Sequence, residues 1–224
     1  MEEENQKMIP YQQVLFEEEE MIERSKMHYE FMNKRRSVRA FSDRDVPEEV
    51  IQYIIRTAGT APSGAHKQPW TFCVIRNSDL KHRIRKLAEE EERKNYSGRM
   101  SERWLKDLEP LGTNAVKEFI DIAPWIIVVM KKSFDFNDDQ KKINNYYVNE
   151  SVGIASGFLI GAIHQAGLVT LTHTPSPMNF IAEALDRPKN EKPYLLLPVG
   201  YAKETCTVPD LERKNLEEIS IYYM

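Results

Sequence analysis

The chain has 224 residues, which is enough for one α/β domain with a full hydrophobic core. Hydrophobic residues make up 41% and charged residues 29% of it, as in soluble globular proteins, and the net charge of −4 argues against nucleic-acid binding, which needs a basic surface. No apolar run approaches the roughly 20 residues of a membrane span, and the acidic start and two isolated cysteines, Cys73 and Cys206, favour a soluble cytoplasmic protein.

The first half of the chain combines a polar lead-in with helices and one strand. Apolar residues recur among charged ones at helical spacing from 19 to 33. Pro47 suits the first turn of a second helix, for which Asp45 is the predicted cap. The predicted elements are an N-terminal arm at 1–18, helices at 19–33, 47–55 and 79–93, an extended segment at 37–41 and a buried strand at 70–76.

The second half begins with a polar segment that carries isolated large apolar residues and is predicted to form a mobile lid at about 95–113. Small residues recur along a long predicted helix, so that another element could approach its backbone closely. Strands alternating with helices predict one α/β or α+β domain at 19–201, followed by a polar C-terminal arm at 202–224. The predicted elements are helices at 115–122 and 144–166 and strands at 124–130, 168–171 and 194–199.

A basic cluster, Arg35-Arg36-Ser37-Val38-Arg39, is the first candidate for ligand binding. In an extended chain Arg35, Ser37 and Arg39 project to one side, and two guanidinium groups with one hydroxyl suit a phosphate monoester. The alternative is a helix C-terminus whose cations stabilise the helix dipole and bind nothing.

The loop at 57–66 is rich in small residues, with Pro62 and Gly64 near its middle. Such a backbone can approach a flat ligand and offer N–H groups to ring atoms or to an oxyanion. The alternative, which composition alone favours, is an ordinary loop.

The acidic run at 89–92 is followed by Tyr96, which shares a helical face with Glu92 if the helix extends that far, and Lys117 is predicted to begin the next short helix. Carboxylate, phenol and ammonium groups could together bind an amino-acid zwitterion. The alternative for the acidic run is a solvated helix face, and Trp104 between these residues could be a core anchor.

Two further groups are less specific. Thr172 and Thr174 follow a predicted strand and would point to one side, either as ligand-facing hydroxyls or as ordinary strand residues. Arg213 by itself reads as a surface charge, and no role is assigned to His173.

Together these segments resemble the nitroreductase superfamily of flavoproteins over roughly residues 20–218. The cluster at 35–39 is similar to its FMN-phosphate motif. The stretch Ala61-Pro62-Ser63-Gly64-Ala65-His66, followed by Gln68-Pro69-Trp70, is similar specifically to iodotyrosine deiodinases. Vertebrate members of that family carry a membrane anchor, and the short acidic lead-in here indicates a soluble bacterial-type homologue.

The resemblance implies an α+β, nitroreductase-like FMN-binding sandwich, in which helices flank a mixed, mainly antiparallel sheet and two chains form an intertwined homodimer. It implies that Glu92, Tyr96 and Lys117 bind the zwitterion of the substrate, that the Ala65 N–H bonds its phenolate, that Trp104 covers its ring and that Thr174 acts at flavin N5. Ala65 and Thr174 are thus the implied catalytic residues. The residues implied to bind FMN are Arg35, Arg36, Ser37, Arg39, Pro62, Ser63, Gly64, Thr172, Thr174 and Arg213.

The activity implied is FMN-dependent reductive dehalogenation of a halogenated tyrosine, such as iodotyrosine, through one-electron steps. NAD(P)H would supply electrons directly or through a reductase, and no metal is expected. The alternatives are a broad nitroreductase or quinone reductase, and a flavin-binding protein without reductive turnover. A non-flavin structural protein would leave the basic cluster unexplained.

Overall fold

The computed structural model describes residues 8–224; residues 1–7, the beginning of the predicted N-terminal arm, lie outside the described residues. The chain divides after Arg35 into two compact units. The first contains helix α1 (Glu18–Asn33), whose first turn carries three glutamates where the helix dipole favours negative charge. None of its residues is buried, and its exposed apolar side chains are Met21, Ile22, Met27 and Tyr29.

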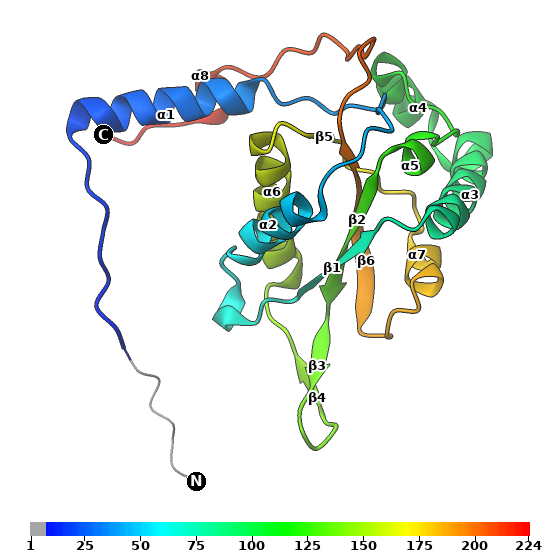
Figure 1. Cartoon of the computed structure of the whole chain (residues 1–224), viewed down its shortest axis with the longest axis horizontal. Helices are drawn as coiled ribbons and strands as arrows, with labels where there is room; N and C mark the ends of the chain where they lie inside the picture. The colour runs from blue at the N-terminus through cyan, green and yellow to red at the C-terminus, as the bar shows by residue number, and fades with distance from the viewer. Residues whose placement is uncertain (1–7) are drawn as a thin grey trace. The chain divides into compact units, whose positions relative to one another are not determined.

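The second unit is built on a four-stranded antiparallel sheet (Figure 1). In spatial order the strands are β1 (Trp70–Ile75), β2 (Trp125–Lys132), β6 (Glu191–Gly200) and β5 (Val169–Thr170). Strand β2 lies in the sheet interior, and its continuous apolar run is buried on both faces. A parallel bridge from Ser37 to Thr170 adds the predicted extended segment beside β5, which makes the sheet mixed.

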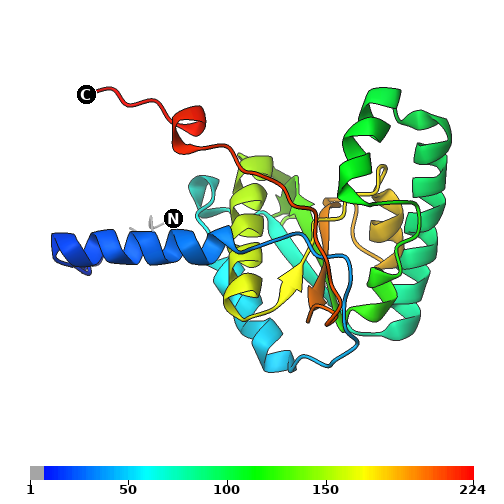
Figure 2. The same ribbon diagram turned by 90° about the horizontal axis from the view of Figure 1, so that it is seen from above.

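Side chains of β2 alternate between two hydrophobic cores. Ile127 and Val129 enter the first core, with helices α2 (Glu48–Gly59) and α6 (Val148–Gln165). Ile126 and Val128 enter the second, with α3 (Ser78–Lys94), α5 (Phe119–Ile122) and α7 (Asn179–Ala184). Figure 2 shows the two groups of helices on opposite faces of the sheet.

Several predicted elements need correction. The strand predicted as buried at 70–76 lies at the edge of the sheet, so its residue Val74 is 40% exposed. Helix α2 has no side-chain cap, because Asp45 instead forms an ion pair with Arg76 at 2.8 Å. The short helix predicted at 115–122 is confined to α5, so Lys117 lies ahead of that helix and does not begin it.

The segment predicted as a lid is mostly helical in the structure. It comprises a π-helical turn η2 (Asn95–Arg99), α4 (Glu102–Leu108) and a 3₁₀ turn η3 (Glu109–Leu111). Further elements that the sequence did not predict are the hairpin β3 (Phe134–Phe136) and β4 (Lys142–Asn144), the 3₁₀ turn η1 (Gly64–His66) and the short helices α7 and α8 (Leu216–Ile219). Within residues 8–224, no helix is long and apolar enough to span a bilayer.

Candidate active site

An ion pair between Glu92 and Lys117 forms the centre of the candidate site. Glu92 lies near the end of α3 and Lys117 lies just before α5, and the carboxylate Oε2 and the ammonium Nζ are 3.5 Å apart. Only 7% of Glu92 and 3% of Lys117 are exposed. Charges so well removed from water interact strongly with each other and with any charged group that enters. Two residues 25 positions apart in the sequence thus meet in the structure.

Tyr96 and Thr113 lie beside this pair. Tyr96 is half-buried in η2, where burial raises the pKa of its phenol while a hydrogen bond with Thr113 opposes the shift. Lys117 Nζ donates to Thr113 Oγ1 at 3.3 Å and to the carbonyl of Asn114. The structure therefore brings all three predicted zwitterion-binding residues into one cluster, and adds Thr113, which the sequence did not indicate.

The positive end of the cluster extends to Arg39. Burial lowers the pKa of the Lys117 ammonium, and the nearby charge of Arg39 acts in the same direction, whereas Glu92 opposes it. Burial also lowers the pKa of Arg39 itself, with Tyr96 opposing. Arg39 was predicted from the basic cluster and Lys117 from a segment almost eighty residues later in the sequence, and their electrostatic coupling joins the two predicted groups.

His173 adjoins the same charges, although no role was predicted for it. It is 6% exposed, its ring packs edge-on against Phe119 at 5.6 Å between centroids, and its Nε2 has no hydrogen-bond partner. Burial, reinforced by the charges of Lys117 and Arg39, lowers its pKa to about 3. The imidazole is therefore neutral at physiological pH.

Thr172 and Thr174 are exposed on either side of the buried His173, as predicted for an extended segment. Two hydrogen bonds between the backbones of His173 and Leu196, of 2.8 and 3.0 Å, hold this segment beside β6. Val38 N–H donates to the Thr170 carbonyl at 3.2 Å, which places the chain around Ser37 next to the same strand end.

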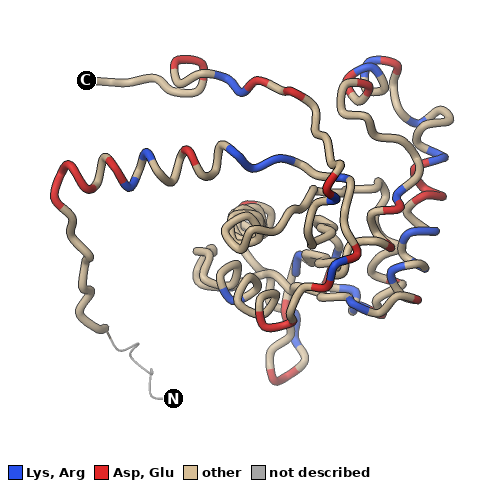
Figure 3. The backbone as a smooth tube through the Cα atoms, turned by 45° about the horizontal axis from the view of Figure 1, so that its top comes forward, with Lys and Arg blue, Asp and Glu red and all other residues tan. Residues whose placement is uncertain are grey.

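Ser37, Thr172 and Thr174 are exposed, and the bridge between Ser37 and Thr170 places the two segments that carry them side by side. Arg36 follows at the start of the same unit, whereas Arg35 ends the other unit and Arg213 lies in the exposed segment after β6. Figure 3 marks the basic run directly after α1 and shows acidic and basic residues interleaved along the helices of the second unit. A donor set of hydroxyl and guanidinium groups fits a phosphorylated, polar cofactor.

The loop that contains Pro62, Ser63, Gly64 and Ala65 lies elsewhere in the same unit. The Gly64 N–H donates to Ser151 Oγ of α6 at 3.3 Å, and a Cβ built on Gly64 would lie 2.8 Å from the Tyr147 ring. In Figures 1 and 2 η1 lies on the side of α2 and α6, whereas the Glu92–Lys117 pair is carried by elements on the α3 side.

Within this loop Ala65 has a left-handed backbone, with φ 48°. The N–H groups of His66 and Lys67 bond to the carbonyls of Ser63 and Gly64, and that of Gln68 bonds to Ser63 Oγ. The surrounding amides are thus held within the loop. Trp104, the remaining predicted site residue, is 50% exposed on α4.

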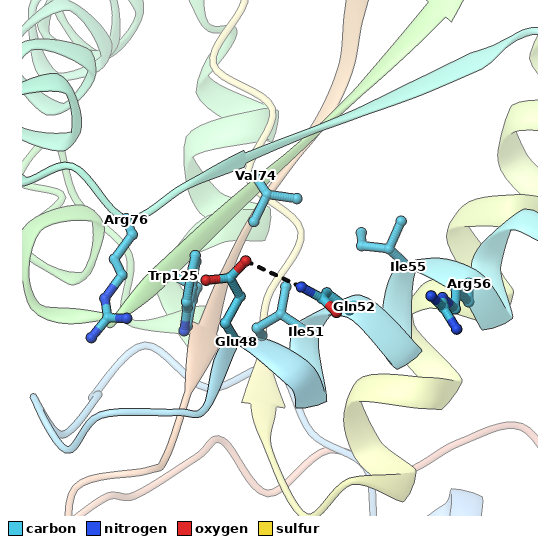
Figure 4. Close-up of a pocket in the computed structure, with 8 residues that line it drawn as sticks. All are labelled: Glu48, Ile51, Gln52, Ile55, Arg56, Val74, Arg76 and Trp125. Atoms are coloured by element: carbon cyan, nitrogen blue, oxygen red, sulfur yellow. Dashed lines mark hydrogen bonds between the residues drawn. The ribbon is translucent and has the colours of Figure 1, made fainter.

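Two surface hollows adjoin the second unit. One, of about 800 Å³, is bordered by Arg39 and by residues 40–43, 118–119, 121–122 and 202–205. The other, of about 590 Å³, lies between α2 and β1 and contains none of the predicted site residues (Figure 4); Gln52 there donates to Glu48 at 3.1 Å. In the part of the chain that the structure describes, no cluster of His, Cys, Asp or Glu could hold a metal ion.

Comparisons with known proteins extend this picture. A model of the nitroreductase family matches residues 32–201. An iodotyrosine deiodinase of Haliscomenobacter hydrossis is 56% identical, over 96% of this chain and 97% of the relative, and human iodotyrosine deiodinase 1 is 50% identical, over 98% and 76%. A crystal structure of oxidised iodotyrosine deiodinase bound to FMN and 3-iodo-L-tyrosine aligns with a TM-score of 0.74 at 28% identity, covering 88% of this chain and 100% of that one.

Proposed function

We propose that this chain uses FMN to remove halide reductively from a halogenated tyrosine. The chain belongs to the nitroreductase family and, within it, to the iodotyrosine deiodinases. The membership confirms the predicted α+β fold, the class of flavin-dependent oxidoreductases and FMN as the cofactor.

The observation that carries the proposal is the buried Glu92–Lys117 pair with Tyr96 beside it. A free amino acid presents an ammonium and a carboxylate on the same carbon. Its ammonium complements Glu92 and its carboxylate complements Lys117, and the Tyr96 hydroxyl can bond to either. A bound zwitterion would replace the single Glu92–Lys117 ion pair by two ion pairs, one with each residue. This favours a zwitterion over a neutral aromatic compound, because burial strengthens charged hydrogen bonds.

The gathered donors near β5 fit FMN. Arg36, Ser37, Arg39 and Thr172 would hold it, with Arg35 and Arg213 at the phosphate and Thr174 at flavin N5. When bound, the flavin supplies the electrons, which we propose are transferred one at a time after NAD(P)H or a reductase has delivered them. The protein residues orient the substrate and exclude water around it, a task in which Trp104 and the lid at about 95–113 would cover the ring.

A second copy of this chain would complete the site. The loop at 62–65, whose Ala65 N–H is proposed to bond the phenolate, lies on the α6 side of the sheet, away from the zwitterion-binding residues. Helix α6 leaves Ile154 and Phe158 more than 40% exposed, and nothing lies within 4 Å of a Cβ built on Gly157 or Gly161. This surface and the exposed apolar side chains of α1 suit close packing of a homodimer, with the N-terminal arm and the arm at 202–224 around the partner.

The test is an anaerobic titration of the reduced, FMN-loaded protein. We expect 3-iodotyrosine to oxidise the flavin rapidly with release of iodide, and 2-iodophenol, which lacks the zwitterion, to do so far more slowly. Equal rates with both compounds, or faster oxidation by nitroaromatic compounds, would instead identify a broad reductase. Flavin that binds but is oxidised by none of them would identify a flavin-binding protein without turnover.

A further inference from the structure

Glu89 is a buried carboxylate to which the sequence assigned no role, and it lies only three residues before Glu92 of the zwitterion-binding cluster. It lies on α3, one turn before Glu92, and only 3% of it is exposed. Its Oε1 accepts the backbone N–H of Lys117 at 2.9 Å in a buried hydrogen bond. A single side chain of α3 thus holds the backbone of the residue whose ammonium faces Glu92.

The charge of Glu89 is balanced within a network that joins α3 to α5. Arg85 Nε donates to Glu89 Oε1 at 2.7 Å, and Arg85 Nη1 donates to Asp121 Oδ2 at 2.8 Å. Arg93 Nη2 approaches Glu89 Oε2 at 3.4 Å. Burial would raise the pKa of Glu89, but the hydrogen bonds from Lys117 and Arg85 outweigh it and lower the pKa, so the group is a carboxylate at neutral pH.

The hydrogen bond from Lys117 to Glu89 fixes the separation between the Lys117 ammonium and the Glu92 carboxylate, which α5 cannot fix by itself. Lys117 precedes the first residue of α5, where its carbonyl accepts the Ile120 N–H at 3.0 Å and a local hydrogen bond joins Val116 to Asn114. These bonds tie Lys117 to α5, but they do not tie it to α3, which carries Glu92. Glu89 and Glu92 are three residues apart on one helix and therefore move together. Anchoring the Lys117 N–H to Glu89 consequently sets the Lys117 ammonium against the Glu92 carboxylate.

We propose that Glu89 is a positioning residue for substrate recognition, which holds Lys117 at the distance from Glu92 that an amino-acid zwitterion requires. The inference rests on the proposed function, because it takes the zwitterion as the ligand. Glu89 does not touch the ligand, and its effect is confined to compounds that carry both an ammonium and a carboxylate.

Two variants separate the reach of this carboxylate from its charge. Glu89→Asp keeps the charge for Arg85 but withdraws the oxygen from the Lys117 N–H by one methylene, whereas Glu89→Gln keeps the reach and an acceptor oxygen but removes the charge. The matched control is Glu90→Ala, since Glu90 lies next to Glu89 in α3 but is 59% exposed in its side chain and pairs with Lys94 at the surface.

The experiment measures the Kd of 3-iodotyrosine for the oxidised, FMN-loaded protein, together with FMN affinity, Tm and the rate with 2-iodophenol. We expect Glu89→Asp to raise the Kd about tenfold, the effect of one lost hydrogen bond to a charged group. The FMN affinity and the rate with 2-iodophenol should stay within about twofold of the parent protein, and Tm should fall by only a few degrees. Glu89→Gln should restore most of the affinity, and Glu90→Ala should match the parent.

Three results would overturn the inference. An unchanged Kd in Glu89→Asp would mean that Lys117 is held without Glu89. A variant that loses FMN affinity, Tm, 3-iodotyrosine binding and the rate with 2-iodophenol together would show a general structural role. A Kd in Glu89→Gln as poor as in Glu89→Asp would show that charge, not reach, matters. A parent protein that does not bind 3-iodotyrosine would instead refute the proposed function, which makes the two failures distinguishable.

Discussion

Replacing Lys117 by methionine tests the buried ion pair through both stability and binding. The substitution preserves the length and apolar stem of the side chain but leaves the Glu92 carboxylate, which is 7% exposed, without its cation. Breaking a buried pair from one side costs about 3 kcal/mol or more. For a chain of this size that corresponds to a fall in Tm of roughly 6–12 °C.

The same substitution removes the proposed partner of the substrate carboxylate. We expect the Kd of 3-iodotyrosine to rise about tenfold to a hundredfold, as for a lost hydrogen bond between charged groups. The double variant Lys117→Met/Glu92→Gln should recover the stability, because no buried charge is left unpaired, but should not recover binding. Tm is read from circular dichroism at one fixed protein concentration and FMN loading, and Kd from quenching of flavin fluorescence.

Arg187→Met provides the matched control. Arg187 Nε pairs with Glu191 Oε2 at 2.7 Å, and Glu191 is 5% exposed at the start of β6, away from the candidate site. This variant should lose stability by a comparable mechanism while binding 3-iodotyrosine like the parent. The reasoning is refuted if Lys117→Met keeps the parental Tm, or if the double variant regains parental affinity.

Three other perturbations address separate features. The pKa of His173 in the folded state is lowered to about 3 from a usual 6.5, so its neutral form adds stability at neutral pH that is lost as pH falls below 6.5. Between about pH 7.5 and 5, the free energy of unfolding in urea should fall by about 2 kcal/mol more in the parent than in His173→Asn, and parallel losses would contradict this. Gly64→Ala should destabilise by about 1–3 kcal/mol because its Cβ meets a tyrosine ring carbon at 2.8 Å, whereas Gly59→Ala, with open space around it, should not; equal unfolding midpoints would refute the clash. Phe158→Glu on α6 should convert the proposed dimer to monomer in analytical ultracentrifugation, unlike Ile143→Glu at an equally exposed site on β4, and a dimeric Phe158→Glu would place the interface elsewhere.

The features predictable from the sequence were those that local chemistry determines. The apolar runs placed β2 and β6 within a few residues of their ends, helical periodicity located α1, and a strongly charged run located α3. Edge or interior position in a sheet depends on pairing with distant strands, so Trp70–Ile75 was wrongly predicted to be buried throughout. Asp45 was wrongly predicted as a cap because its partner, Arg76, is thirty-one residues away in sequence.

The candidate site was predictable in its residues but not in its arrangement. Family motifs named Glu92 and Lys117, yet only the tertiary structure shows their ion pair. The sequence did not indicate that His173 is buried beside the site, because a histidine between two threonines carries no local sign of what it packs against. The alternation of an extended segment predicts only that it faces away from Thr172 and Thr174.

The placement of the Ala65 loop and the Lys117 segment on opposite sides of one sheet has consequences for pairs of defective chains and for activity at low protein concentration. On the proposed pairing, each working site borrows its loop from one chain and its zwitterion-binding residues from the other. A chain defective in the loop and a chain defective in Lys117 would then complement each other, since a mixed pair retains one intact site. Specific activity would also fall on dilution, as mass action separates the chains.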